Sequence, residues 1–132
     1  MGGKIALRYS IDKQRRLVLT KADGCVTFDD MRGHQDRLLA DREFDASFDQ
    51  LIDTTLTTEF EISADKARIL AERRIVAPES RRAIVATKPH IFGMGRMMEI
   101  YHLDVGTEVQ VFYSMDEALK WLGKGRGATS ES

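Results

Sequence analysis

The chain has little of the chemistry that builds disulfide or metal scaffolds, since Cys25 is the single cysteine among its 132 residues. One thiol excludes an internal disulfide and any metal site made from several cysteines. No histidine or lysine stands beside Cys25, so we expect an unreactive, partly buried residue near a strand end. His34, His90 and His102 lack the spacing and the carboxylate companions of a metal site, and we predict neither a metal nor a cofactor.

The sequence also lacks long apolar runs and an excess of one charge. No run approaches the roughly 20 apolar residues that span a membrane, and the opening MGGKIALRYS has no apolar centre of a secretion signal. Twenty basic and 21 acidic residues nearly cancel, so no positive field would recruit nucleic acid or an anionic membrane. Short arginine pairs such as Arg81-Arg82 are expected to be solvated. We therefore expect a cytoplasmic protein without a nucleic-acid partner or a membrane span.

What is present fits a globular domain with its own core, at 42% hydrophobic and 31% charged residues. We expect a single domain over residues 1–123. Glycine, serine and threonine dominate residues 124–132, which predicts a flexible C-terminal tail.

Hydrophobic patterning predicts an α/β fold in the order β-β-α-β-α-β-α-β-α. A short polar turn joins residues 5–11 to residues 16–20, which indicates an antiparallel hairpin, with Cys25-Val26 able to continue its pairing. The strands at 48–53, 82–87 and 108–113 follow helices, so right-handed crossovers make them parallel neighbours. These segments together predict a mixed five-stranded sheet. Residues 83–86 show no polar alternation, which is typical of a strand buried on both faces in the middle of a sheet.

The helices are predicted from their first residues. Thr27, Ser63 and Ser114 are good N-caps, and Pro89 suits the first turn of the third helix. The first helix has an apolar stripe of Phe28, Met31, Gln35, Leu38 and Leu39, and His34 lies off it, as a surface histidine would.

The segments between and within the other helices carry further expectations. Residues 54–62 are expected to form a loop, and Pro78 is expected to end the second helix. In the third helix, Met97 and Ile100 widen the apolar stripe. Gly93 and Gly95 are poor helix formers there, so we expect each to permit close packing against the sheet or a partner.

Three segments together resemble the SpoIIAA-like branch of the STAS superfamily, the sulfate-transporter and anti-sigma-factor antagonist domains. They are the strand 48–53, which ends in aspartate, the segment IFGMGRM at 91–97, and Val111-Phe112 followed by EALKWL at 117–122. In the second segment Gly93, Arg96 and Met97 match the family's pattern. The resemblance spans about residues 5–122 and implies the family's small α/β fold.

The resemblance also implies a regulatory function. Anti-sigma antagonists are phosphorylated by a partner kinase on a serine or threonine after the third strand, and the phosphate breaks a protein complex. Asp53-Thr54-Thr55 matches that motif in kind, with Leu56 in place of the usual glycine. Thr54 and Thr55 are thus the candidate phosphoacceptors. A phosphate there brings roughly −2 charge to an interface, and Asp53 would repel it, which would favour displacement of a partner.

A second kind of site is expected where the parallel strands end. Ligands of open parallel sheets usually lie outside the carboxyl ends of the strands, where helix starts offer backbone N–H groups. Each residue at this edge has an alternative to ligand binding, which is to cap a turn or helix or to be solvated. For Arg96 the alternative is a solvated or ion-paired side chain. The candidates for a ligand or partner edge are Asp53, Thr87, Lys88, His90, Arg96, Tyr113 and Ser114.

Two functions of different classes follow. The first is a non-enzymatic regulatory module that binds another protein, such as an anti-sigma-type kinase, or a second copy of itself. The second is a domain that binds a small anion, nucleotide or lipid at the edge of the sheet. An enzyme is not predicted, because Asp53 and His90 have no nucleophile beside them.

Overall fold

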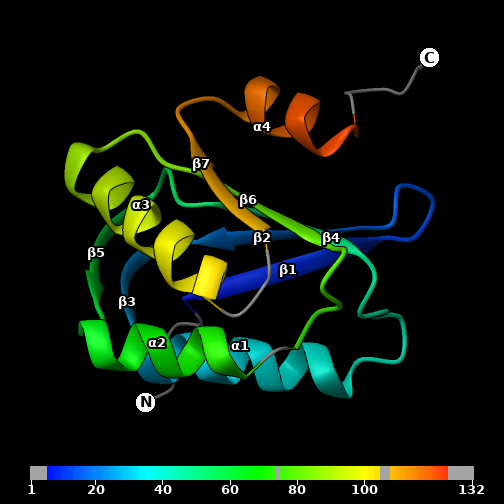
Figure 1. Ribbon diagram of the computed structural model, residues 1–132, viewed down its shortest axis with the longest axis horizontal. Helices are drawn as coiled ribbons and strands as arrows, with labels where there is room; N and C mark the ends of the chain where they lie inside the picture. The colour runs from blue at the N-terminus through cyan, green and yellow to red at the C-terminus, as the bar shows by residue number, and fades with distance from the viewer. Residues whose placement is uncertain (1–5, 74, 105–107, 125–132) are drawn as a thin grey trace.

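The computed structural model describes residues 6–73, 75–104 and 108–124. A five-stranded sheet lies between three helices on one face and a single helix on the other (Figure 1). In chain order the elements are β1 (Leu7–Asp12), β2 (Leu17–Ala22), β3 (Gly24–Thr27), α1 (Phe28–Ala40), β4 (Asp49–Asp53), β5 (Thr57–Glu61), α2 (Ala64–Glu72), β6 (Arg81–Val85), α3 (Pro89–Asp104), β7 (Glu108–Phe112) and α4 (Met115–Leu122).

The main sheet has the strand order β1-β2-β4-β6-β7. β1 pairs antiparallel with β2, and every other neighbouring pair is parallel. This confirms the predicted mixed sheet with an antiparallel hairpin at one edge. Strand β6 lies between β4 and β7, and residues 83–86 are buried as expected.

The prediction of a plain loop at residues 54–62 was wrong, because β5 lies within it and pairs parallel with β3 in a separate two-stranded sheet. Cys25 and Val26 therefore do not extend the hairpin. Gly24 has φ 71°, a left-handed conformation that glycine adopts without strain, and its N–H donates to Leu56 O at 3.0 Å. The Thr57 hydroxyl donates to Ala22 O at 2.7 Å and joins the two sheets. The pattern TTEFE hides this strand because most of its side chains face solvent.

The helix boundaries follow the predicted capping chemistry. Thr27 forms a full capping box with Asp30 at the start of α1, and Ser63 and Ser114 accept the expected hydrogen bonds at α2 and α4. Gly123 ends α4 in the left-handed conformation, with φ 72°. Pro78 does not end α2, since that helix already stops at Glu72.

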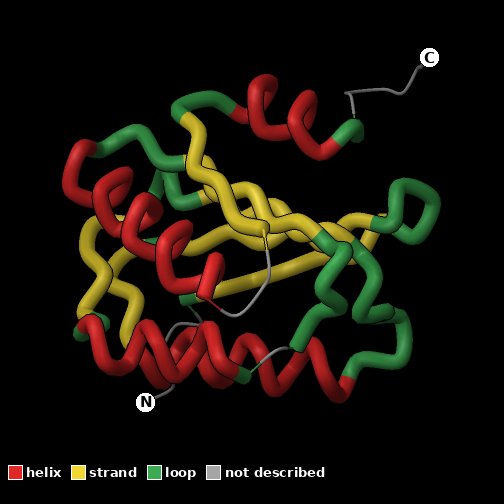
Figure 2. The backbone as a smooth tube through the Cα atoms, in the orientation of Figure 1, coloured by secondary structure: helices red, strands yellow, loops and turns green. Residues whose placement is uncertain are grey.

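The two faces of the sheet carry separate cores, because side chains alternate along each strand. Ala83 and Val85 of β6 pack against α4, whereas Ile84 of the same strand packs against α3. The helices on the two faces are clear in the backbone trace (Figure 2). Strand β6 thus contributes to both layers, and its even-numbered residues face α3.

Several single-residue predictions were wrong. His34 is 2% exposed, because α1 is covered by the sheet on one side and by α2 on another. Leu39 and Ile100 are 55% and 59% exposed instead of lying in the core. Cys25 is exposed rather than partly buried, since its strand is half of the small outlying sheet.

The two glycines of α3 differ in their surroundings. A Cβ atom built on Gly95 would lie 2.7 Å from Val111 Cγ2, so the predicted close packing against the sheet is confirmed at this position. A Cβ on Gly93 would have nothing within 4 Å, so packing against the sheet was wrong at this position, and packing against a partner stays a prediction.

Candidate functional site

Two of the predicted edge residues, Asp53 and Lys88, form one hydrogen-bonded group with the candidate phosphoacceptor Thr55 where β4 ends. Asp53 Oδ1 accepts from the backbone N–H of Thr55 at 2.9 Å and from its hydroxyl at 2.7 Å. Lys88 Nζ donates to the backbone oxygen of Thr55 at 2.8 Å. The group therefore holds the turn after β4 in place, and Thr55 keeps a half-buried hydroxyl beside a carboxylate.

The other candidate phosphoacceptor, Thr54, has a different environment. It is 1% exposed, and its hydroxyl donates to Val85 O at 2.6 Å. Its backbone N–H donates to the same carbonyl at 2.9 Å. Thr54 thus ties β4 to β6, and in this conformation a kinase would not reach its hydroxyl.

The remaining edge candidates lie apart from that group. His90 Nε2 donates to Thr58 O at 2.8 Å, and Thr87 is exposed. Tyr113 is 61% exposed and stacks on Phe92 with ring centroids 4.0 Å apart. Ser114 caps α4.

Two features that were predicted at this edge lie elsewhere. They are Arg96 and the start of α2. Arg96 is on the solvent side of α3, where its NH1 lies 3.9 Å from Glu99 Oε1. The start of α2 is also displaced, since β5 separates that helix from β4.

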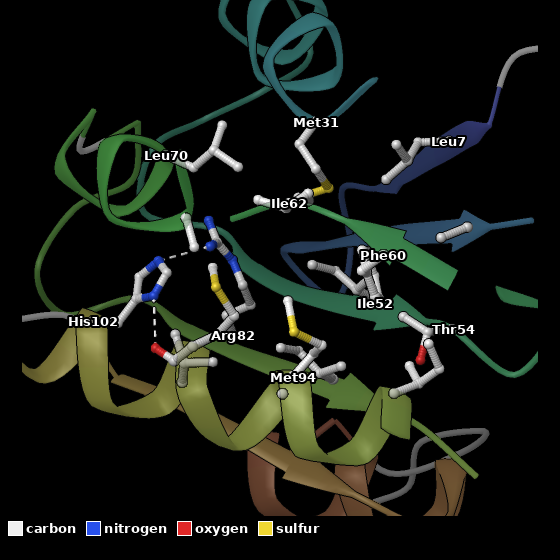
Figure 3. A pocket seen from close by; sticks show the side chains of 17 residues that line it. Leu7, Met31, Ile52, Thr54, Phe60, Ile62, Leu70, Arg82, Met94 and His102 are labelled. Carbon is white, nitrogen blue, oxygen red and sulfur yellow. Dashed lines mark hydrogen bonds between the residues drawn. The ribbon is translucent and has the colours of Figure 1, made fainter. Parts of the chain in front are cut away.

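An apolar cavity of about 50 Å³ lies between the main sheet and α1, α2 and α3. Side chains of 17 residues line it, nearly all of them apolar (Figure 3). The sheet contributes its α3-facing residues, β5 closes one side, and two flexible methionines project from α3. The principal apolar contributors are Ile52, Ile84, Val109, Phe60, Ile62, Ile91, Met94 and Met98.

One end of this cavity is polar. Arg82 of β6 and His102 of α3 lie there, and Thr54 lies at the other end (Figure 3). Arg82 NH1 is 3.1 Å from His102 Nε2, and His102 Nδ1 is 3.0 Å from Met98 O. A carbonyl oxygen only accepts, so Nδ1 carries the proton and Nε2 accepts from the guanidinium. The cavity therefore ends at an arginine held by a neutral histidine.

Burial controls the charge state of both groups. Burial first, and then the neighbouring Arg82 cation, lower the pKa of His102 to about 4. Burial also lowers the pKa of Arg82 to about 10, which leaves the guanidinium protonated at neutral pH. The site thus carries one positive charge.

That charge has no carboxylate partner among the described residues. Arg82 as a whole is half-buried, but its Nε atom is fully buried and makes no hydrogen bond. Gln50, the register partner of Arg82 on β4, also has a buried side-chain nitrogen without an acceptor. Both residues line a water-sized hollow of about 10 Å³ next to the main cavity. Buried donors without acceptors are costly, so this cluster calls for an explanation.

Sequence reasoning missed this site because Arg82 was interpreted as a solvated residue and His102 was considered only as a metal ligand. Period-2 alternation places Arg82 on the same face as Ile84 and Ala86, which was a usable signal. Helical spacing likewise places His102 in the stripe of Met94 and Met98. Both faces of β6 are buried. A charged residue on this strand is therefore expected to point its side chain into the protein.

Other kinds of site find no support within the described ranges. No cluster of three or more His, Cys, Asp or Glu side chains could hold a metal ion among those residues. No helix in the same part of the chain is both long enough and apolar enough to cross a membrane.

Comparison with known proteins identifies the fold. No protein-family model matches the chain, and no curated protein matches it. Among solved structures, it is similar to the crystal structure of an uncharacterized protein of the DUF3478 family from Shewanella loihica PV-4, described as having a SpoIIAA-like fold. The match covers 92% of this chain and 98% of that chain, with a TM-score of 0.62 and 19% sequence identity. The chain therefore has a SpoIIAA-like fold, as the STAS resemblance implied.

Proposed function

We propose that this chain uses its SpoIIAA-like fold as a non-enzymatic binding module, and that it takes a small apolar molecule into the cavity between the main sheet and α3. The observation that carries the proposal is the cavity itself, with its nearly all-apolar lining. Protein interiors are usually packed with few voids larger than a water molecule. A cavity of about 50 Å³ exceeds the roughly 10–15 Å³ that one water needs.

The lining favours a small ligand and a degree of adaptation. Cavities of roughly 150 Å³ lined by apolar side chains bind benzene or xenon. The smaller cavity of this chain therefore suits a molecule with fewer heavy atoms than benzene. Met94 and Met98 are unbranched and change rotamer easily, which lets α3 adjust to the occupant. Gly95 meets Val111 directly, so α3 lies close to the sheet beside the cavity.

Xenon is a direct probe of such a cavity. We expect xenon-saturated buffer to shift the methyl NMR signals of Ile84, Ile91 and Leu70, which line the cavity. Leu17 and Leu119 belong to the core under α4 and supply an internal control. Small, uniform shifts across both cores would contradict the proposal.

A second candidate is a protein-binding module switched by phosphorylation, with an anti-sigma-type kinase as the partner. The observation that favours it is the half-buried Thr55 hydroxyl, 2.7 Å from Asp53 Oδ1. A phosphate there would face the carboxylate and break this hydrogen bond, which would loosen the turn that Lys88 also holds. Incubation with anti-sigma-type kinases and intact-mass analysis tests it, with Thr55→Val as the control. Phosphate absent from the native chain would rule out the switch.

The partner of this second candidate is another protein or a second copy of the chain. Sedimentation of the purified chain over a range of concentrations distinguishes a monomer from a homodimer. A constant monomer mass would leave another protein as the partner.

A further inference from the structure

We propose that Arg82 recognises the head group of the cavity's ligand, and that this ligand is a small alkyl monocarboxylate whose apolar part occupies the cavity. The inference rests on the proposed function, since it assigns a chemical class to the molecule held there. It comes from the end of the cavity that Arg82 and His102 line, next to an otherwise apolar space.

The guanidinium has an unused binding edge. NH1 donates to His102, whereas the buried Nε has no acceptor. A carboxylate binds arginine through two parallel N–H···O bonds, and the edge that includes Nε provides such a pair. The residue lines both the main cavity and the smaller hollow, so an anion there would sit at the end of the apolar space.

His102 and Gln50 orient this edge without adding charge, whereas Arg81 and the exposed Glu108 also line the smaller hollow. His102 is neutral, donates to Met98 O and accepts from NH1, so it fixes the guanidinium through one nitrogen. Gln50 stands beside Arg82 in register and offers a buried amide that can reorient to donate. Among the described residues no carboxylate pairs with Arg82. The site therefore balances a single negative charge better than the roughly −2 charge of a phosphate monoester.

The size of the cavity limits the length of the apolar part. At about 50 Å³ it holds a short chain, well below the volume that benzene needs. Each buried methylene contributes about 0.8 kcal/mol, which is roughly a fourfold gain in affinity. Affinity should therefore rise steeply from acetate through the first few homologues and then level off. A free small acid follows this course, whereas a lipid-derived fatty acid would bind more tightly up to long chains.

The experiment is a calorimetric or NMR titration with straight-chain carboxylates from acetate to octanoate and with palmitate. Primary alcohols of matched length have the same tail without the charge. We expect a short carboxylate to bind at least tenfold more tightly than its alcohol, because charge-assisted bonds are the strong ones. Equal affinity of acid and alcohol would overturn the assignment of Arg82 but leave the proposed function intact. Failure of xenon and of every alkyl ligand to bind would overturn both.

Two variants separate Arg82 from its neighbour. Arg82→Met keeps an unbranched apolar stem and removes the charge, so the preference for the acid over the alcohol should vanish while alcohol binding persists. Arg81→Met is the matched control, since Arg81 points to the other face and stacks over the Trp121 ring at 4.6 Å. It should leave the preference unchanged. Arg82→Lys retains a positive charge but lacks the paired N–H donors of the guanidinium. It should give an intermediate preference for the acid over the alcohol. An undiminished preference in Arg82→Met would refute the proposal, as would affinity that keeps rising to palmitate.

Discussion

Glu99 Oε2 accepts a hydrogen bond from the backbone N–H of Val111 at 2.7 Å, so a side chain of α3 occupies the outer edge of β7. β7 is the last strand of the main sheet, and an unpaired edge offers its N–H and C=O groups to other chains. Glu99 is largely buried at this position, with its side chain 19% exposed. The carboxylate thus occupies one of the backbone donors that strand addition at this edge would use.

Removal of this contact should promote association. Glu99→Ala leaves the Val111 N–H without its acceptor, which should cost about 1.5–3 kcal/mol of stability. It should also raise the apparent mass in concentration-dependent sedimentation. Glu99→Gln keeps an acceptor oxygen and is the matched control, with a smaller loss. A stable, equally monomeric Glu99→Ala variant would contradict the role given to the carboxylate.

The two glycines of α3 should respond in opposite directions to alanine. Gly95→Ala places a Cβ 2.7 Å from the branched side chain of Val111, and overpacking of this kind costs about 1–3 kcal/mol. Gly93→Ala meets open space and should stabilise the helix by up to about 1 kcal/mol. Urea unfolding at neutral pH measures both. Equal effects of the two substitutions would show that helix propensity, and not contact with the sheet, decides the outcome.

Two buried histidines should make the fold sensitive to mild acid. Burial lowers the pKa of His34 and of His102 from 6.5 to about 4. The unfolded chain therefore binds more protons than the folded chain between these values, so stability is lost as pH falls from about 6.5 to about 4. At pH 5 the loss is about 2 kcal/mol for each histidine.

Urea unfolding at pH 7.5 and pH 5 measures this loss. Asp12 and Asp41 have pKa values lowered from 3.8 and contribute mainly at lower pH. His34→Gln or His102→Gln should remove about half of the difference between pH 7.5 and pH 5. Equal stability of the native chain at both pH values would show that neither histidine is held neutral.

Arg82 should lower the stability of the folded chain when no ligand is bound. A buried cation without an anionic partner loses its hydration, and replacement by an apolar residue of similar length is often stabilising. The lost hydrogen bond to His102 offsets part of that gain. We expect Arg82→Met to raise stability by about 1 kcal/mol, measured as the free energy of unfolding. A large loss instead would identify Arg82 as a structural residue.

Fold prediction succeeded where local patterns and tertiary burial agree. The five strands of the main sheet and the caps Thr27, Ser63 and Ser114 were identifiable because apolar runs and hydroxyl side chains mark them. The small β3-β5 sheet was not, since its strands are short and mainly exposed and its pairing joins distant segments. Polar sequence carries little signal for a strand at the periphery.

The cavity was not predictable from the chain because it depends on how α2 and α3 sit on the sheet. Its end residues, Arg82 and His102, have polar side chains that normally face water. The register of β6 with β4 brings Arg82 beside Gln50, and the helical turn of α3 brings His102 to the guanidinium. Thr54 shows the reverse error, since a motif that suggests an accessible hydroxyl is used to join two strands.

The order of the main sheet has a consequence for synthesis on the ribosome. Its strands succeed one another in space as they do along the chain, so each new strand adds to the edge left by the preceding one. No strand has to insert between two that are already paired. The N-terminal hairpin can form first, and the sheet can then grow vectorially as translation proceeds. Glu99 is made before β7, so the group that closes the final edge is present when that strand arrives.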